Sequence, residues 1–172
     1  MSSRSKSKFL IELLEVIIIV FALSWFSKTF IFGFAQMPDD SMLPTLGVNN
    51  HILVDKCFYK NTRTLKRGDI VVFLTDNNQN ENIKRLIGLA GDKIEIRNGF
   101  TYVNDKPLYE PYAHIPITNQ FKPIIVPDDH IFVLNDNRTA KDDSRLTGSI
   151  PKENLVGKAV LCYWPWPRIK SL

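Results

Sequence analysis

KIEIRNGFTYV, residues 93–103, carries the clearest local structural signal in the chain. Apolar and polar side chains alternate on both sides of the Asn98-Gly99 pair, with the period of a half-buried β-strand. Both central residues of a two-residue type I′ turn need a positive φ, a requirement that Asn-Gly meets well. The stretch therefore predicts a β-hairpin with its turn at Asn98-Gly99.

Similar short apolar runs, separated by turn-forming residues, lie on both sides of this hairpin. They are HILV (51–54), DIVVFL (69–74), HIFVL (130–134) and KAVLCY (158–163). Each has the length of a strand, and the sequence after residue 36 contains no long amphipathic helical stripe. The predicted fold class is therefore mostly β, as a partly closed barrel or as packed antiparallel sheets.

Length, composition and charge indicate an ordinary folded domain. The chain has 172 residues, of which 44% are hydrophobic and 23% charged, so it can bury one core. Of the formal net charge of +4, residues 1–35 contribute +2, from four Lys and Arg against two Glu. The other +2 is spread over residues 36–172, whereas a nucleic-acid-binding surface shows a stronger basic stripe. Composition therefore argues against nucleic acid as a partner, and it does not indicate an oligomeric state.

The cysteines and histidines are too scattered for a metal site. Cys57 and Cys162 lack a neighbouring CxxC partner, and His51, His114 and His130 stand far apart in the sequence. We therefore expect neither a metal ion nor a cofactor. The two cysteines fit either a single bridge or two buried free thiols, and the thiols are the better fit.

The N-terminus differs in character from the rest of the chain. Residues 1–8 are basic, and residues 9–35 form an apolar stretch with only three charged side chains. This length and hydropathy predict a transmembrane anchor over 9–35, and positive charge before the span predicts a cytoplasmic N-terminus. Residues 36–172 would then form one extracytoplasmic β-domain at the cell membrane.

Two points about membrane contact stay open at the level of sequence. A cleaved secretory signal ending at residues 33–35, or a buried helix of a soluble protein, would also explain the apolar stretch. Near the C-terminus, YWPWPRI (163–169) can either place aromatic rings in the bilayer interface or use them to close the core.

Ser41 and Lys84 are the residues best suited to hydrolytic chemistry without a metal. Ser41 lies in the turn-rich PDDSMLPTL, and Lys84 lies inside the apolar, strand-like NIKRLIGLAGD. Burial disfavours a charged ammonium, so a desolvated lysine can act as general base for a serine nucleophile. The alternative interpretation is a turn serine and a lysine on the solvated face of a strand.

Four blocks of sequence resemble, in order and approximate spacing, those of the type I signal peptidases. They are SMLPTL (41–46), RGDIVVF (67–73), KRLIGLAGD (84–92) and NDNRTAKDDSRLTG (135–148). With the N-terminal segment, the resemblance covers nearly the whole chain. It implies the β-fold of that family, an uncleaved membrane anchor, and a serine endopeptidase in contact with the lipid bilayer. The implied substrates are exported preproteins, cleaved after a small-x-small site that is typically Ala-x-Ala.

The resemblance also assigns roles to single positions. It implies that Ser41 is the nucleophile and Lys84 the general base, and the chemistry needs an oxyanion donor, for which we expect the backbone N–H of Ser41. The other residues that it implies for the site or its support are Met42, Arg85, Asp136, Asn137, Arg138, Asp143, Ser144 and Arg145.

Two residues depart from the family pattern close to the implied site. Asp39 stands where the family usually has Ser or Gly, and Lys141 stands where it usually has Ser. Because the two changes introduce opposite charges, we expect Asp39 and Lys141 to pair across the site and to tune it. The same departures suggest an alternative function, a catalytically weakened relative that acts as a membrane-tethered binding or assembly factor.

Overall fold

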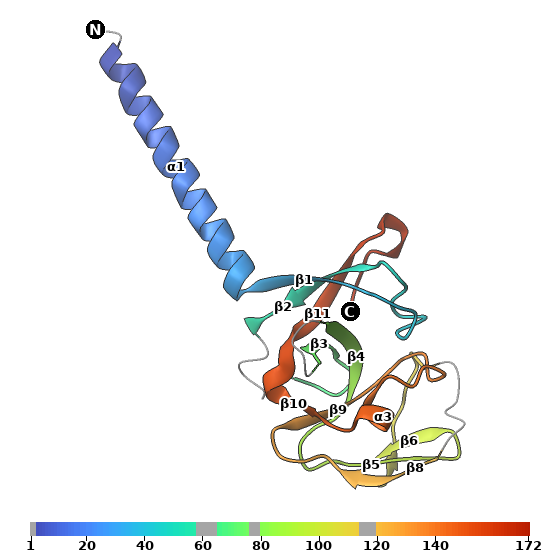
Figure 1. Ribbon diagram of the computed structural model, residues 1–172. Coiled ribbons are helices and arrows are strands. Elements are labelled where there is room, and N and C mark those ends of the chain that lie inside the picture. The colour runs from blue at the N-terminus through green and yellow to red at the C-terminus, as the bar shows by residue number, and fades with distance from the viewer. Residues whose placement is uncertain (1–2, 58–64, 76–79, 114–119) are drawn as a thin grey trace.

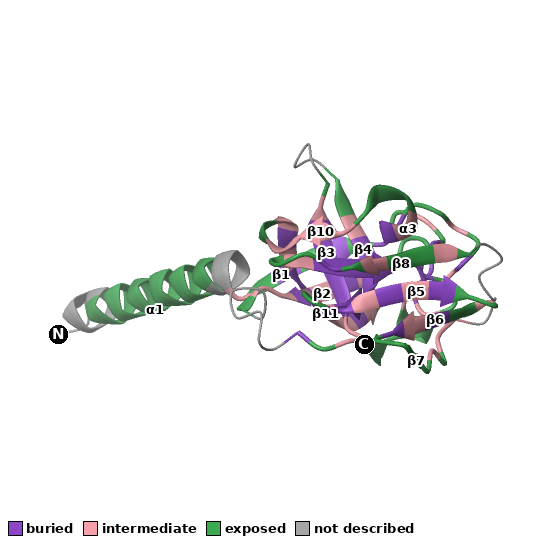
Figure 2. Cartoon of the chain, turned by 90° about the horizontal axis from the view of Figure 1, so that it is seen from below, coloured by how far each residue is buried: buried purple, intermediate pink, exposed green. Residues whose placement is uncertain are grey.

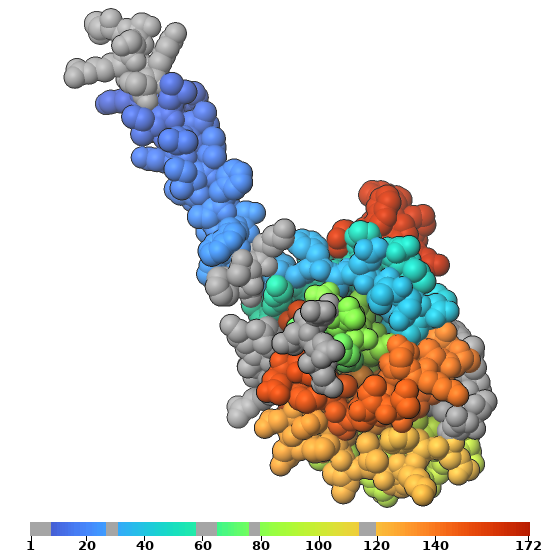
Figure 3. Space-filling view, in the orientation of Figure 1, coloured from blue at the N-terminus to red at the C-terminus, as the bar shows by residue number. Residues whose placement is uncertain are grey.

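Helix α1 (Ser3–Phe30) leads into a β-domain in the computed structural model (Figure 1). The structure describes residues 3–57, 65–75, 80–113 and 120–172, and within α1 the side chains of residues 8–26. The segment Lys8–Phe26 has a mean hydropathy of 2.4, is long enough to cross a membrane, and has no buried residue. It is exposed along its length (Figure 2) and stands clear of the domain (Figure 3).

The predicted anchor extends too far along the chain. Helix α1 ends at Phe30 and β1 (Phe32–Gln36) follows it, so the last residues of the 9–35 segment form a strand. Exposed and buried residues alternate along β1, which pairs antiparallel with β2 (His51–Asp55). In the sequence, phenylalanine alternates with small residues there, so the strand period is hidden inside an apolar run.

The larger sheet has eight strands, all paired antiparallel. Its order is β1-β2-β11-β3-β4-β9-β10, with β12 paired to β11. The remaining strands are β3 (Ile70–Leu74), β4 (Glu81–Gly88), β9 (His130–Leu134), β10 (Ile150–Pro151), β11 (Leu155–Trp164) and β12 (Lys170–Ser171). Register shifts interrupt the pairings of β11 and of β4 with β9. Such irregularities bend a sheet, and this one curls into a half-barrel (Figure 1).

The smaller sheet contains the predicted hairpin. Its order is β7-β6-β5-β8. The strands are β5 (Lys93–Arg97), β6 (Phe100–Val103), β7 (Lys106–Pro107) and β8 (Phe121–Ile125). Outside the two sheets, the described residues also form the short helices α3 (Ser144–Thr147), η2 (Lys152–Asn154) and η3 (Trp166–Arg168). Asn98 has a φ of 52° and Gly99 a φ of 85°, as a type I′ turn requires.

The mostly β fold class is confirmed, and each run predicted as a strand matches one. The six runs correspond to β2, β3, β5, β6, β9 and β11. The sequence analysis did not predict β8, because Pro123 interrupts its short apolar run. This strand lies at the edge of its sheet, where a proline is tolerated because no neighbouring strand needs its missing N–H.

Apolar neighbours fix the loop that carries Ser41. Met37, Met42 and Leu46 come from this loop between β1 and β2, and each is at most 1% exposed. They share one cluster with Ile52 of β2 and other buried residues of the larger sheet. Burial of side chains of this size contributes about 1.5–3 kcal/mol each relative to exposure. The loop is therefore anchored to the sheet on both sides of Ser41.

The two cysteines differ in their surroundings. Cys162 is buried on β11, whereas Cys57 is exposed, and no disulfide joins these two described residues. The expectation of buried thiols is therefore confirmed for Cys162 and wrong for Cys57.

Gly157 lies where β11 passes between its two neighbouring strands. A Cβ at this position would overlap the backbone carbonyl oxygen of Asp55 and a methyl group of Val54. Because the backbone of β2 cannot yield without disturbing the sheet, we expect Gly157→Ala to lower the free energy of unfolding by about 1–3 kcal/mol. Denaturant unfolding of the detergent-solubilised chain measures this. The matched control is Gly33→Ala, whose Cβ makes its one very close contact with the flexible end of Lys56, and an equal loss in both variants would contradict the explanation.

Candidate active site

Ser41 is buried, with 2% of its surface exposed, in the loop between β1 and β2. Its backbone carbonyl accepts a hydrogen bond of 2.9 Å from the N–H of Asn137, which ties this loop to the segment after β9. The predicted support residue Met42 is fully buried in the core next to it. The position of Ser41 is therefore set by packing below the loop and by a hydrogen bond across to a second loop.

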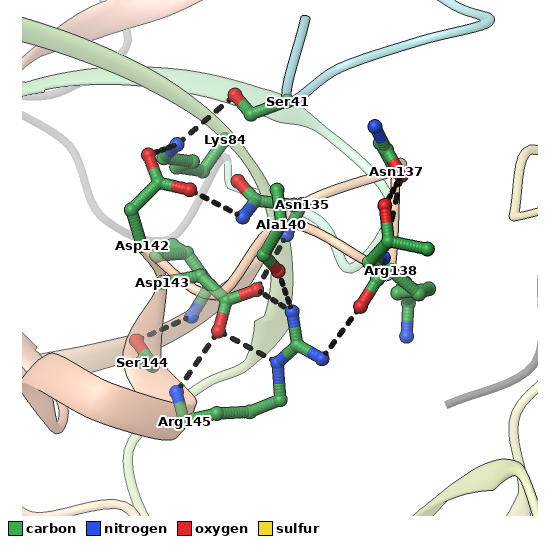
Figure 4. Close-up of polar contacts among 12 residues, drawn as sticks. Ser41, Lys84, Asn135, Asn137, Arg138, Ala140, Asp142, Asp143, Ser144 and Arg145 are labelled. Carbon is green, nitrogen blue, oxygen red and sulfur yellow. Dashed lines mark hydrogen bonds and ion pairs between the residues drawn. The ribbon is translucent and has the colours of Figure 1, made fainter. Parts of the chain in front are cut away.

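Lys84 brings its ammonium group to Ser41 from β4. Its Nζ donates hydrogen bonds of 3.1 Å to Ser41 Oγ and 2.7 Å to Asp142 Oδ2 (Figure 4). The side chain of Lys84 is only 2% exposed. Its register partner on β3 is Val71 and its same-face neighbour on β4 is Leu86, both fully buried, so its stem lies among apolar groups. The two residues predicted to carry the chemistry are thus in direct contact.

Asp142 contacts the lysine directly but was not identified by the sequence analysis. Its Oδ1 accepts a hydrogen bond of 2.9 Å from Asn135 Nδ2, while Oδ2 receives Lys84 Nζ. Burial acts to raise the pKa of Asp142, but the hydrogen bond and charge of Lys84, together with the hydrogen bond from Asn135, outweigh it and lower that pKa below its usual value. The available signal was the doubled aspartate in KDDSR, of which the resemblance assigned a role to the second only.

The Asp39 side chain is hydrogen-bonded to the backbone N–H of Ser41, the donor expected for an oxyanion. Its Oδ1 accepts a hydrogen bond of 2.9 Å from the backbone N–H of Ser41. The expected pairing of Asp39 with Lys141 is wrong, because the ion pairs of the described residues do not include it and Lys141 is exposed. A short acidic side chain two residues before an N–H readily folds back onto it, and this local contact replaces the one across the site.

Arg85 and Asp136 join the Ser41 loop, β4 and the segment after β9. Arg85 Nε donates to Asp136 Oδ1 at 2.9 Å, and Arg85 Nη1 donates to the carbonyl of Gly68 at 2.8 Å. Thr45, from the Ser41 loop, donates through Oγ1 to Asp136 Oδ2. Asp136 is 1% and Arg85 8% exposed, so this is a buried charge pair with extra hydrogen bonds on both partners.

Asp143 and Arg145 shape the segment that presents Asp142. Asp143 accepts hydrogen bonds from the backbone N–H groups of Asn135 and Arg145, each 3.0 Å, and from Arg145 Nε at 2.8 Å. Arg145 Nη1 donates to the carbonyl of Arg138 at 2.9 Å (Figure 4). Ser144 Oγ accepts from the N–H of Val133 on β9 at 3.0 Å. This network folds the segment back on itself, so that Asp142 points at Lys84.

Arg138 connects the same segment to the smaller sheet. Its guanidinium donates to Thr101 Oγ1 of β6 at 3.1 Å and to Glu110 Oε1 at 2.6 Å. Tyr112 donates to the same Glu110 oxygen at 3.2 Å, and its ring lies 4.1 Å from the Arg85 guanidinium carbon. Burial, reinforced by the charge of Glu110, raises the pKa of the Tyr112 hydroxyl. The sequence analysis did not identify Glu110 and Tyr112, because they lie in a loop that has no periodic pattern of apolar and polar residues.

A cavity of about 420 Å³ opens beside the site. Asp142 lines it together with Asn82 of β4 and Phe73 of β3. In the described part of the chain, no three His, Cys, Asp or Glu side chains come together to hold a metal ion, and His114 lies outside that part. The side chains that meet at the site offer a hydroxyl, an amine and carboxylates.

The family model, two related sequences and one solved structure that match this chain all bear the name signal peptidase. The family model described as signal peptidase, peptidase S26, matches residues 10–164. A probable signal peptidase I-2 of Synechocystis is 40% identical over 84% of this chain and 69% of its own length. A signal peptidase I P of Bacillus subtilis subsp. natto is 38% identical over 97% of this chain and 95% of its own length. A crystal structure of a signal peptidase I from Enterococcus faecalis V583 covers 55% of this chain and 96% of that chain, with 29% identity and a TM-score of 0.48.

The match to the family model extends from the apolar helix to the end of β11 and includes both residues of the Ser41–Lys84 contact. The relatives are 38–40% identical to this chain over most of their own length, which is enough to assign the family. The chain belongs to the signal peptidase family, peptidase S26.

Proposed function

We propose that this chain is a membrane-anchored serine endopeptidase that removes N-terminal signal peptides from exported preproteins, with Ser41 as nucleophile and Lys84 as general base. The observation that carries the proposal is the 3.1 Å hydrogen bond between Lys84 Nζ and Ser41 Oγ in a site where both residues are 2% exposed. The names of the relatives support the substrate class.

The reaction follows from this contact in two balanced steps. Neutral Lys84 takes the hydroxyl proton of Ser41 as Oγ attacks the scissile carbonyl carbon, and it returns that proton to the nitrogen of the departing mature protein. The signal peptide remains as an ester on Ser41. Water then attacks the ester carbonyl while Lys84 takes its proton, and the proton passes to Ser41 Oγ as the signal peptide leaves.

The negative oxygen of each tetrahedral intermediate needs a hydrogen-bond donor. The backbone N–H of Ser41 is the expected one, but the Asp39 carboxylate accepts from it. A substrate oxyanion and an ionised carboxylate cannot share one donor, since like charges repel. The Asp39 carboxylate must therefore move away from this N–H before each chemical step.

A strand edge that has no pairing partner among the described residues supports an extended substrate. Residues 81–84 of β4 pair with β3 on one side, whereas the pairing of β4 with β9 begins only at Arg85. An extended peptide can add to such an edge through its main chain. Alternate side chains of that peptide then face the enzyme, which accounts for recognition of two small residues separated by a third, as in Ala-x-Ala.

The membrane arrangement rests on α1 and on apolar groups near it. Helix α1 and the hairpin at the end of β11 project from the same side of the domain (Figure 1). That hairpin exposes Trp166 (77%), and β1 exposes Phe34 (56%), both side chains that favour a bilayer interface over water. The basic residues Arg4, Lys6 and Lys8 at the start of α1 favour a cytoplasmic N-terminus, with the β-domain on the opposite side of the cell membrane.

A second candidate function is a membrane-tethered binding or assembly factor with weakened catalysis. Two observations favour it: the Asp39 carboxylate holds the expected oxyanion donor, and the Asp142 carboxylate holds the lysine. Both acidic groups oppose a step of the proposed reaction. The two functions differ in whether a folded parent protein yields product.

Removal of either reacting side chain tests the proposed function. We expect Ser41→Ala and Lys84→Ala each to lower kcat/KM by at least about 10³-fold, because the nucleophile or the proton acceptor is lost. The measurement is cleavage of a preprotein with an Ala-x-Ala site by the full chain in lipid vesicles. Lys122→Ala, on the exposed face of β8, is the matched control and should cleave like the parent. A folded parent without product on several preproteins would favour the second candidate.

Removal of the Asp39 carboxylate tests the blocked donor. We expect Asp39→Ser to raise kcat/KM by about tenfold, because an oxyanion donor is worth roughly 10²–10³ in rate and is only partly freed in the parent's reaction. Asp40→Asn removes an exposed neighbouring carboxylate and should change little. Because Asp39 and Lys141 do not pair, the effects of Asp39→Ser and Lys141→Ser should add in the double variant. A lower rate in folded Asp39→Ser would contradict this explanation.

A further inference from the structure

Lys84 Nζ has two hydrogen-bond acceptors, and the second, Asp142, has no part in the two-residue mechanism. We propose that Asp142 is a positioning residue for the general base, which holds Lys84 against Ser41 and sets the pH range in which the lysine accepts a proton. This inference rests on the proposed roles of Ser41 and Lys84.

The geometry shows how the position of Nζ is fixed. A lysine side chain is long and flexible, so one acceptor alone leaves its end free to rotate. Here Nζ lies between Ser41 Oγ at 3.1 Å and Asp142 Oδ2 at 2.7 Å, so two elements fix its end. Asn135 Nδ2 holds the other carboxylate oxygen at 2.9 Å, which orients the carboxylate itself. The result is a chain of hydrogen bonds from Asn135 through Asp142 and Lys84 to Ser41 (Figure 4).

The acceptor for Lys84 Nζ lies one residue after a position at which this chain departs from the family pattern. Lys141 replaces the expected serine, and its exposed side chain does not reach the site. Asp142, the next residue, turns inward because Asp143 holds the segment through Asn135 and Arg145. The group that this segment presents to Lys84 Nζ is therefore a charged carboxylate.

The charge of Asp142 has a consequence for the base. An ionised carboxylate at this distance stabilises the ammonium form of a lysine, which cannot accept a proton from Ser41. The proton must first leave Nζ, and Asp142 remains ionised at neutral pH because its pKa is lowered. The proton is therefore released to water, which contacts the exposed side chain of Asp142 beside Nζ.

The other charged groups near Lys84 do not cancel this effect. Arg85 on the same strand is paired with Asp136, and Asp143 is paired with Arg145. Asp69, next to β3, is paired with Lys158. Other charged groups in the described adjoining segments are Asp39, which accepts from the backbone of Ser41, and the exposed Asp40, Glu81 and Lys141. Among the described residues, Asp142 is the charged group in ion-pair contact with Nζ.

The test is the pH dependence of kcat/KM for the full chain in lipid vesicles. Asp142→Asn keeps an acceptor oxygen and removes the charge, so we expect the acidic limb of the profile to move at least about one unit to lower pH. Asp142→Ala removes both, so the limb should move likewise and the plateau at high pH should fall by about tenfold or more, since misplaced groups react slowly. Asp142→Glu keeps the charge and should leave the limb near that of the parent.

Controls distinguish a failure of this inference from a failure of the proposed function on which it rests. Asp40→Asn removes a negative charge next to Ser41 without contact to Lys84, and it should leave the limb in place. An active parent with an unmoved limb in Asp142→Asn and Asp142→Ala would overturn the role of Asp142 and leave the Ser41–Lys84 mechanism intact. Product formation that persists in Ser41→Ala would instead overturn the proposed function. Because Asp142→Asn and Asp142→Ala leave the buried Lys84 without its ion-pair partner, we expect both to melt below the parent at neutral pH, and the profiles are measured below the melting temperature of every variant.

Discussion

A lysine amine buried beside a serine hydroxyl is the constraint on which the rest of this structure depends. Lys84 is 2% exposed and its Nζ lies 3.1 Å from Ser41 Oγ. Burial of an ammonium is costly unless it is paired and hydrogen-bonded, and here a single carboxylate supplies the charge. In the proposed mechanism Lys84 must lose a proton before it acts as base, and the carboxylate of Asp142 opposes that loss. The burial of Lys84 and its ion pair with Asp142 together determine the chemistry of the site.

The fold brings these groups together from distant parts of the chain. A curled antiparallel sheet places β4 between β3 and β9, and buried neighbours hold the Ser41 loop on its surface. The Arg85–Asp136 pair joins the strand that carries the lysine to the segment that carries Asp142, and Thr45 adds the serine loop to the same carboxylate. Arg138 extends this network to β6 of the smaller sheet through Thr101, and it also pairs with Glu110. Because the Arg85–Asp136 and Arg138–Glu110 ion pairs are buried, removal of either partner would leave the other charge unpaired.

Sequence patterns predicted the parts of this structure that local physics determines. Alternation of apolar and polar residues located strands such as β5 and β6, and Asn98-Gly99 located their turn. Resemblance located Ser41 and Lys84, whereas spacing alone left them ambiguous. Contacts between loops were not predictable, because no period or propensity encodes them: Asp142 was missed, and Asp39 folds onto the backbone of Ser41 instead of pairing with Lys141.

The central claim, that Ser41 attacks with Lys84 as its base, predicts a covalent intermediate. The direct measurement is mass spectrometry of the full chain quenched with acid during cleavage of a preprotein. The account predicts an adduct with the mass of the signal peptide on the proteolytic fragment that contains Ser41, and no such adduct in Lys84→Ala. Cleavage by the parent with the adduct on another residue, or an adduct of equal yield in Lys84→Ala, would contradict it.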